Sequence, residues 1–224
     1  MNNFLNYLDP EPDLETRVTQ RAEYLSVGSQ RFAEIKAFLE PLKVKDRATY
    51  EHSLRVGLLA SFLCKFMHLD PKAGLYSGLL HDVGKAQTKL STLQKTEGWT
   101  PADTEEIKGH CLDGYRFLRD KFDFTAEIIL WHHRFQPNKY PETIPEPLHN
   151  YCEGTRVMIP FFGRVLSLCD VFDAFHRINS QSAGVPLTGE RIKELMLERN
   201  PDQRILIEEA YMAGIFTTNI MGAV

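Results

Sequence analysis

The spacing of apolar residues constrains the fold of this 224-residue chain more than any other feature. In most segments these residues recur three and four positions apart, which places them on one face of an α-helix. Long alternating patterns, which are typical of β-strands, are missing. Examples of the helical spacing are Phe32, Ile35, Phe38 and Leu39, then Val56, Leu59 and Leu63, and later Ile192, Leu195 and Met196. The sequence therefore predicts an all-α bundle.

Helix-capping residues and prolines divide this bundle into helices. The predicted helices are 14–26, 30–40, 46–68, 71–84, 102–120, 123–133, 160–178, 188–198 and 202–214. Asp46 marks one helix start, and Asp70 and Thr100 mark two others because each is an N-capping residue followed by proline. The stretch from Gln136 to Pro160 carries five prolines and predicts a long loop, of the kind that is often functional.

No repeat or linker divides the chain into two cores. We expect an N-terminal appendage at 1–30 and one domain at 31–224, with its main motifs within 46–176 and C-terminal helices within 187–216. The apolar C-terminal segment after Thr188 is expected to cover the core, and support of a homodimer is the alternative.

Composition limits the class of partner and the compartment. A formal net charge of -4, with both signs interspersed, provides no positive field for a long nucleic acid but is compatible with a small phosphorylated nucleotide. The four cysteines are far apart and predict reduced thiols. The acidic N-terminus, broken by Pro10 and Pro12, does not resemble a signal peptide, and no apolar run reaches the roughly 18 residues of a membrane span. We therefore expect a soluble cytoplasmic protein with no membrane partner.

Polar residues at apolar helix faces indicate the chemistry. His52 shares a face with Val56 and Leu59, and Asp170 shares a face with Leu166, so an imidazole and a carboxylate point toward the core. A single inward histidine or aspartate is ordinarily a hydrogen-bonded core residue, because burial is costly unless its polar atoms are satisfied. Here five histidines and two aspartates share this context: His52, His81, Asp82, His110, His132, His133 and Asp170. Divalent metals would satisfy all of them, so the sequence predicts a buried metal centre.

Adjacent ligands impose a condition on the local backbone. His81 and Asp82 would project about 100 degrees apart on a regular helix, so they reach one ion only beside a helix end or kink. Gly84 is predicted to supply that break.

These residues resemble the signature of the HD superfamily of metal-dependent phosphohydrolases, and most closely that of the HD-GYP phosphodiesterases. The resemblance runs from about residue 46 to residue 176 and covers four blocks in the same order: LLHDVGK, EEIKGHCLDGYRFL, WHH and IPFFGRVLSLCDVFDAF. It implies an HD-domain helical bundle with a buried dinuclear metal centre.

The resemblance also assigns roles residue by residue. It implies that Asp82 bridges two divalent ions, with His52, His81 and Asp170 completing one site and His110, His132 and His133 completing the other. A hydroxide bridging two ions about 3.5 to 4 Å apart would be the nucleophile, so no side chain need attack. Lys85 matches a lysine of the family that contacts phosphate; the alternative is an ordinary solvated lysine. Asp82 and Lys85 are the predicted catalytic residues. Iron or manganese is expected first, and zinc, nickel or cobalt are alternatives.

The sequence departs from the family pattern around the substrate. A third-metal glutamate is replaced by Ala48, so we expect two metals. Arg134 replaces an acidic residue, and the GYP loop is reduced to Asn138-Lys139-Tyr140-Pro141. Arg177 stands in a substrate-binding stretch, and the segment 142–158 carries roughly ten extra residues that would reshape the pocket mouth. The predicted substrate contacts are Lys85, Arg134, Lys139, Tyr140 and Arg177.

The favoured function is hydrolysis of a cyclic dinucleotide or another nucleotide phosphoester. One alternative is diiron oxygen chemistry, which some proteins of the HD fold perform, although those generally have one histidine where this chain has His132-His133. The other is a catalytically degenerate signal-binding module, against which the complete ligand set argues.

Overall fold

The computed structural model describes residues 13–176 and 187–217. Every regular element in these two ranges is a helix, which confirms the predicted all-α class. In chain order the elements are α1 (Leu14–Tyr24), α2 (Ser29–Lys45), α3 (Arg47–Phe66), α4 (Pro71–Leu80), η2 (Val83–Ala86), α5 (Leu90–Leu93), α6 (Pro101–Lys108), α7 (His110–Leu118), α8 (Asp123–Ile129), α9 (Glu153–His176), α10 (Gly189–Arg199), η3 (Pro201–Gln203) and α11 (Arg204–Met212).

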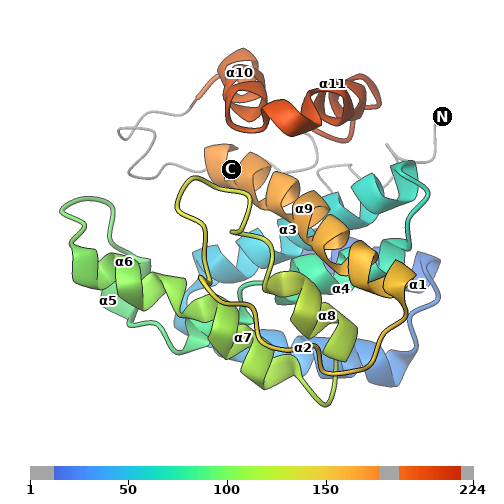
Figure 1. Cartoon of the computed structure of the whole chain (residues 1–224), viewed down its shortest axis with the longest axis horizontal. Coiled ribbons are helices and arrows are strands. Elements are labelled where there is room, and N and C mark those ends of the chain that lie inside the picture. The colour runs from blue at the N-terminus through green and yellow to red at the C-terminus, as the bar shows by residue number, and fades with distance from the viewer. Residues whose placement is uncertain (1–12, 177–186, 218–224) are drawn as a thin grey trace.

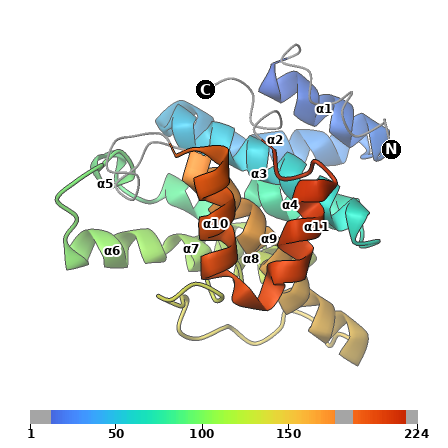
Figure 2. The same cartoon turned by 90° about the horizontal axis from the view of Figure 1, so that it is seen from above.

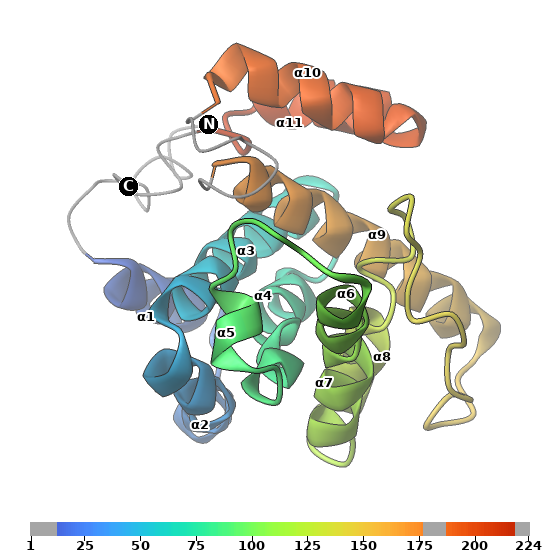
Figure 3. The same cartoon turned by 90° about the vertical axis from the view of Figure 1, so that its left-hand side faces the viewer.

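Helices α3, α4 and α9 form the centre of the bundle (Figure 1), and each packs against the other two. Helices α1 and α2 pack on α3, while α7 and α8 close the opposite side. Short helices α5 and α6 lie side by side at one end of the molecule, and α10 and α11 form an outer layer over α9 (Figures 2 and 3). The metal-ligand candidates are carried mainly by the central helices and by the segments that flank them.

The contact between α3 and α4 depends on glycine. A Cβ atom at Gly78 would lie 2.6 Å from the Cα atom of Gly57, and also 2.6 Å from the carbonyl oxygen of Val56. Real side chains do not approach backbone atoms this closely, so the two helices touch where neither has a side chain. This approach brings His52 on α3 next to His81 at the end of α4.

The predicted helix starts are confirmed. The Asp46 carboxylate accepts a hydrogen bond from the Thr49 backbone at the start of α3. The Asp70 carboxylate accepts from the Lys72 backbone at the start of α4. Thr100 and Asp103 cap each other at the start of α6, so both side chains satisfy amide groups that a helix end leaves free.

Three predicted helices end or divide earlier than the sequence suggested. The predicted helix 71–84 ends at Leu80, and the helix 123–133 ends at Ile129. The predicted helix 102–120 is divided at Gly109 into α6 and α7. In each case a candidate ligand follows the break within three residues. Neighbouring side chains on an unbroken helix would diverge, so the break allows them to reach one centre.

Helix α9 begins earlier than predicted. It starts at Glu153 rather than near residue 160, and therefore contains Gly154 and Pro160, which the sequence had placed in the loop. Helix α2 likewise continues through Pro41 to Lys45. A proline inside a helix leaves the carbonyl four residues earlier without its bond. Those carbonyls belong to Arg156 and Ala37, which are both exposed, so solvent can satisfy them.

Both ends of the described chain pack on the bundle. Val18 and Ala22 of α1 are buried, and the Arg21 guanidinium donates to Ser61 of α3. At the other end Ile192, Met196, Ile207, Ala210 and Phe216 are buried, so the C-terminal helices cover the core as expected. The domain boundary at residue 30 and the homodimer stay predictions. None of the described helices combines the length and apolar character needed to cross a membrane.

Candidate metal centre

Backbone carbonyls fix the orientation of three histidines. The Nδ1 atom of His81 donates to the Gly78 carbonyl at 2.8 Å, and His110 and His132 donate in the same way to the carbonyls of Ile107 and Ile129. Each bond runs to the residue three positions earlier, which is within reach because each histidine follows the end of a helix. A proton on Nδ1 leaves the lone pair of Nε2 free to bind a metal.

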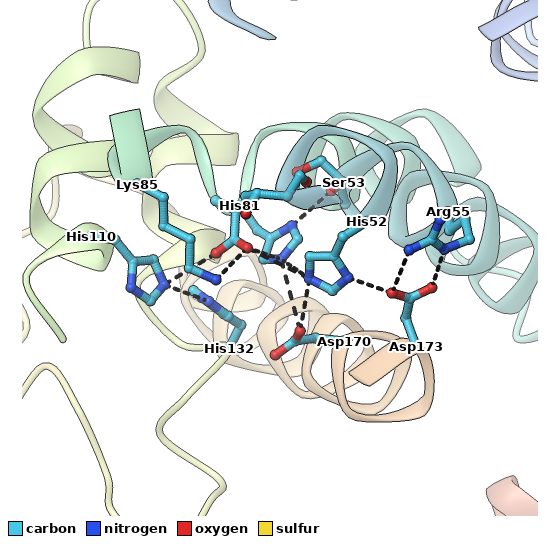
Figure 4. A network of polar contacts seen from close by, with 12 residues as sticks. His52, Ser53, Arg55, His81, Lys85, His110, His132, Asp170 and Asp173 are labelled. Atoms are coloured by element: carbon cyan, nitrogen blue, oxygen red, sulfur yellow. Dashed lines mark hydrogen bonds and ion pairs between the residues drawn. The ribbon is translucent and has the colours of Figure 1, made fainter. Parts of the chain in front are cut away.

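The fourth oriented histidine, His52, uses a carboxylate instead. Its Nδ1 lies 2.6 Å from Oδ2 of Asp173, and the Arg55 guanidinium donates to Oδ1 of the same carboxylate at 2.6 Å. Figure 4 shows this chain of contacts, which runs from Arg55 through Asp173 to His52 and then toward His81. Its effect is to place the free Nε2 of His52 at the centre of the cluster.

The free nitrogens face one another. His52 Nε2 lies 3.2 Å from His81 Nε2, and His110 Nε2 lies 3.3 Å from His132 Nε2. Since the Nδ1 atoms already donate elsewhere, each pair brings two lone pairs together without a proton to share. Such contacts are repulsive in a water-free interior unless a cation lies between them, so the residues fit a metal site.

Asp82 lies between the two histidine pairs. Its Oδ2 atom is 3.5 Å from His52 Nε2 and 3.4 Å from His81 Nε2, whereas its Oδ1 atom is 3.3 Å from His110 Nε2. The carboxylate is fully buried, and Oδ1 has no hydrogen-bond partner. The backbone of Asp82 has φ −102 and ψ 6, so it leaves the helical path directly after α4. Two oxygens that face different pairs are what a bridging ligand requires.

Asp170 and His133 complete the set. Oδ1 of Asp170 is 3.2 Å from His52 Nε2, and Oδ2 is 4.0 Å from His133 Nδ1, which is buried without a hydrogen-bond partner. His133 stacks on the ring of Tyr140 at 4.3 Å between centroids. The predicted ligands therefore lie together: His52, His81 and Asp170 form one group, His81, Asp82 and His132 another, and His110, His132 and His133 a third, which also contains Cys111.

The electrostatics of the centre suit metal binding. Burial lowers the pKa of His110 to about 3 and that of His133 to about 4, and it also holds the pKa of His132 well below its usual value. Burial opposes ionisation of Asp82, but His81 and Lys85 outweigh it and hold the pKa of that carboxyl well below its usual value. Neutral imidazoles and ionised carboxylates are the forms that bind divalent ions.

His81 differs from these three histidines. Burial lowers its pKa, but the carboxylates of Asp82 and Asp170 together outweigh burial, so the pKa of His81 rises. The two carboxylates thus favour a positive charge at this position, which a divalent ion would supply.

Lys85 reaches the same cluster from η2. Its Nζ atom donates to Oδ2 of Asp82 at 2.6 Å, and its side chain is mostly buried. Figure 4 shows the ammonium group on the side of the cluster near His110. The position is compatible with contact to a substrate phosphate, although that role stays a prediction.

Gly84 has a different role from the predicted one. The chain leaves the helix already at Leu80 and Asp82, before Gly84 is reached. A Cβ atom at Gly84 would lie 1.9 Å from the carbonyl oxygen of His110. The glycine is therefore needed where η2 packs on α7, and this packing holds Asp82 against His110.

The remaining predicted substrate residues lie on one loop or outside the described residues. Tyr140 packs beside His133 and His110. The Arg134 guanidinium donates to the backbone carbonyls of Pro141 and Glu142, and Lys139 is exposed. Arg177 falls in the segment 177–186, which lies outside the described residues. Substrate contacts by these four residues stay predictions.

The inserted segment lines a separate pocket. A cavity of about 160 Å³ lies between α8, the loop and the start of α9, and Trp131, Ile144, Tyr151 and Pro160 are among its lining residues. None of the predicted ligands lines it. Trp131, which precedes the ligand pair, is the lining residue next to the ligands in the chain, and the role predicted for the insertion at the pocket mouth stays a prediction.

Three contributors were missed or only partly anticipated. Arg55 lies three residues after His52 on the same helix face, and this spacing could have indicated a shared partner. Asp173 lies three residues after the predicted ligand Asp170 on α9, and it binds His52. Cys111 was interpreted as a core or surface thiol, yet its Sγ lies 3.5 Å from His110 Nε2. Like Asp82, Cys111 directly follows a candidate histidine ligand beside a helix terminus, here the start of α7.

Comparison with known families agrees with this geometry. A model of the HD domain matches residues 49–174, more than half of the chain, and this range includes all seven predicted ligands. The chain belongs to the HD domain family. The HD histidine-aspartate pair is His81-Asp82, at the end of α4.

Curated relatives of this HD domain include phosphodiesterases. A cyclic di-GMP phosphodiesterase of Pseudomonas aeruginosa is 32% identical over 141 residues, which are 59% of this chain and 31% of that protein. A cyclic di-GMP phosphodiesterase of Thermotoga maritima is 29% identical over 58% of this chain and 35% of that protein. A 3'3'-cGAMP-specific phosphodiesterase of Vibrio cholerae is 27% identical over 58% of this chain and 29% of that protein. The chain thus spans about a third of the length of these relatives.

A solved structure supports the fold. The HD domain of the phosphodiesterase PgpH of L. monocytogenes, in complex with cyclic-di-AMP, aligns with a TM-score of 0.52 and 18% identity. The alignment covers 82% of this chain and 90% of that one. At this identity the likeness shows the helical HD fold alone.

Proposed function

We propose that this HD domain is a metal-dependent phosphodiesterase that hydrolyses a cyclic dinucleotide or another nucleotide phosphoester. The observation that carries the proposal is the buried Asp82 carboxylate, whose two oxygens face different histidine pairs while Lys85 lies 2.6 Å away. This arrangement combines a bridging ligand with a cation suited to a phosphate, as phosphoryl transfer at two metals requires.

The side chains have three proposed roles: some hold the metal ions, one orients a ligand, and one binds the substrate phosphate. His52, His81, Asp82 and Asp170 would hold one ion, and His110, His132 and His133 would complete the second position with Asp82. The two ions would supply a water-derived nucleophile of lowered pKa and neutralise charge on the phosphoryl oxygens. Lys85 would pair with a non-bridging phosphate oxygen, and Asp173 would keep His52 in the ligating tautomer.

The substrate class is proposed from the curated relatives. All three curated relatives named above carry names of cyclic-dinucleotide phosphodiesterases. We infer that the chain is of the HD-GYP type with a degenerate GYP loop, in which Tyr140 packs on the ligand His133 and Lys139 remains exposed toward solvent. Such a loop would contact the substrate through Tyr140 and Lys139, and Arg177 would add a further contact.

Metal identity is proposed from ligand chemistry. Imidazole and carboxylate ligands suit iron and manganese, with zinc, cobalt and nickel as further candidates. We propose two ions per chain. Glu51 lies three residues after Ala48, which stands at the position of the third-metal glutamate. Glu51 pairs with Arg47 at 2.7 Å and therefore points away from the centre.

The proposal is tested by metal analysis combined with hydrolysis assays. Natively purified protein would be analysed for metal and then assayed with cyclic dinucleotides, linear dinucleotides, nucleotides and a chromogenic phosphodiester. We expect about two ions per chain and hydrolysis that Asp82→Ala abolishes and His149→Ala retains, because His149 pairs with Asp123 outside the centre. Bound metal without turnover of any substrate would contradict the phosphodiesterase and favour oxygen chemistry or signal binding.

A further inference from the structure

A cysteine lies within the second half of the centre. Cys111 is fully buried, and its Sγ belongs to a group with His110, His132 and His133 whose ligand atoms all lie within 4.8 Å of one another. Figure 4 shows His110 and His132 with their free nitrogens directed at the same point. The HD resemblance assigns no ligand at this position, and the proposed mechanism does not use it.

The distances between these atoms match the edges of a metal polyhedron. A divalent ion with nitrogen at about 2.0–2.1 Å and sulfur at about 2.3 Å separates neighbouring nitrogens by roughly 2.9–3.3 Å and a nitrogen from a sulfur by roughly 3.1–3.5 Å, from six-coordinate to four-coordinate geometry. Here His110 Nε2 lies 3.3 Å from His132 Nε2 and 3.5 Å from Cys111 Sγ. Both distances therefore fit pairs of ligand atoms that bind one ion.

A hydrogen bond alone leaves the local chemistry unsatisfied. The Cys111 thiol can donate to His110 Nε2, but one proton neutralises one lone pair. His132 Nε2 and Oδ1 of Asp82 would still face His110 Nε2 at 3.3 Å each. Oδ1 of Asp82 and Nδ1 of His133 are buried without hydrogen-bond partners, which also indicates a cation in this half of the centre.

Local backbone geometry explains how adjacent residues converge. His110 and Cys111 would diverge by about 100 degrees within a regular helix. His110 is the first residue of α7, and its Nδ1 turns back to the Ile107 carbonyl of α6 across the break at Gly109. The imidazole therefore lies over the helix start, where the next side chain can reach its Nε2.

We propose that Cys111 is a thiolate ligand of the second metal position, beside His110, His132 and His133. On binding, a sulfur–metal bond forms and the thiol proton passes to solvent, with no change of oxidation state. A soft sulfur ligand favours zinc, cobalt or ferrous iron over manganese at this position. The inference rests on the proposed metal centre and adds a ligand and a metal preference to it.

Cobalt provides a readout independent of activity. In the cobalt-loaded full-length protein we expect the near-ultraviolet absorption of a sulfur-to-cobalt charge transfer. Cys111→Ser should abolish this band, whereas Cys152→Ser, at an exposed cysteine, and Cys64→Ser, at another buried one, should retain it. Cys111→Ser should also lower zinc affinity at least tenfold more than manganese affinity. A band that survives in Cys111→Ser would overturn the proposal.

A measurement on the unaltered protein covers the case in which the variant does not fold. X-ray absorption at the zinc edge of zinc-loaded protein should reveal sulfur scattering at about 2.3 Å. Bound zinc with only nitrogen and oxygen neighbours would overturn the role of Cys111 and leave the proposed function standing. Failure to bind zinc, cobalt or manganese would overturn both.

Discussion

A single hydrogen bond decides whether His52 can act as a ligand. Its Nδ1 is held by Asp173, which is fully buried and paired on its other oxygen with Arg55. Burial alone would raise the pKa of Asp173, but the charges and hydrogen bonds of His52 and Arg55 outweigh it and lower that pKa. Asp173 therefore remains ionised, and the imidazole keeps its Nε2 lone pair directed at the centre.

Asp173→Asn should weaken metal binding without removing a ligand. The amide has the size of the carboxylate but lacks its charge, so it no longer fixes the tautomer of His52 as strongly. We expect metal affinity to fall by roughly 10- to 100-fold, measured by competition with a chromogenic chelator. Asp113→Asn is the matched control, since Asp113 pairs with Arg116 on the surface. Unchanged affinity in Asp173→Asn would show that His52 is oriented without this carboxylate.

Residue types were easier to predict from the sequence than their partners. Histidine and aspartate at apolar faces identified all seven ligand candidates, because burial of such groups demands compensation. Cys111 was not identified, since a buried thiol is ordinarily inert and nothing in its own helix distinguishes it. Only the contact across Gly109 gives it significance.

At the scale of elements, the interruptions of the helices position the candidate ligands. The helix ends at Leu80 and Ile129 and the division at Gly109 each release a histidine from helical geometry. Sequence periodicity predicted the helices but carried them through these points, because Leu80 and Ile129 have no helix-breaking tendency and an isolated glycine such as Gly109 is tolerated within a helix. Pro160 led to the opposite error, since α9 begins seven residues before it and the carbonyl that loses its bond belongs to the exposed Arg156.

Packing of η2 against α7 should depend on Gly84. Gly84→Ala would place a methyl group 1.9 Å from the His110 carbonyl and 2.6 Å from the Gly114 backbone nitrogen. Neither backbone atom can move without shifting α7, so we expect a loss of about 1–3 kcal/mol in the free energy of unfolding, together with weaker metal binding. Denaturant midpoints and metal titrations would measure both effects.

The matched control for this substitution is Gly154→Ala. Gly154 lies within α9, and a Cβ atom there would meet nothing within 4 Å. Alanine is the better helix former by about 1 kcal/mol, so this variant should be as stable as the parent or more stable. If both variants behaved alike, the close approach of η2 to α7 would not be a constraint.

At the scale of the molecule, the centre connects segments that are far apart in the chain. His52 on α3 and Asp170 on α9 approach to 3.2 Å, and His81 and His110 reach the same cluster from α4 and α7. Without a cation, the interior holds facing lone pairs and an unpartnered carboxylate oxygen. An ion in this position would stabilise the folded chain selectively, because the unfolded chain has no such constellation.

Metal removal should therefore lower the melting temperature. At a metal concentration of 100 times Kd, binding to the folded state alone contributes about 2.7 kcal/mol. For a protein of this size that corresponds to a rise in Tm of roughly 5–11 °C. Differential scanning calorimetry of chelator-treated and reloaded protein would measure the difference. His52→Ala should lose most of this rise. His149→Ala should retain it, because His149 lies on the exposed loop and pairs with Asp123, away from the centre. Equal melting temperatures with and without metal would show that the cluster is stable without an ion.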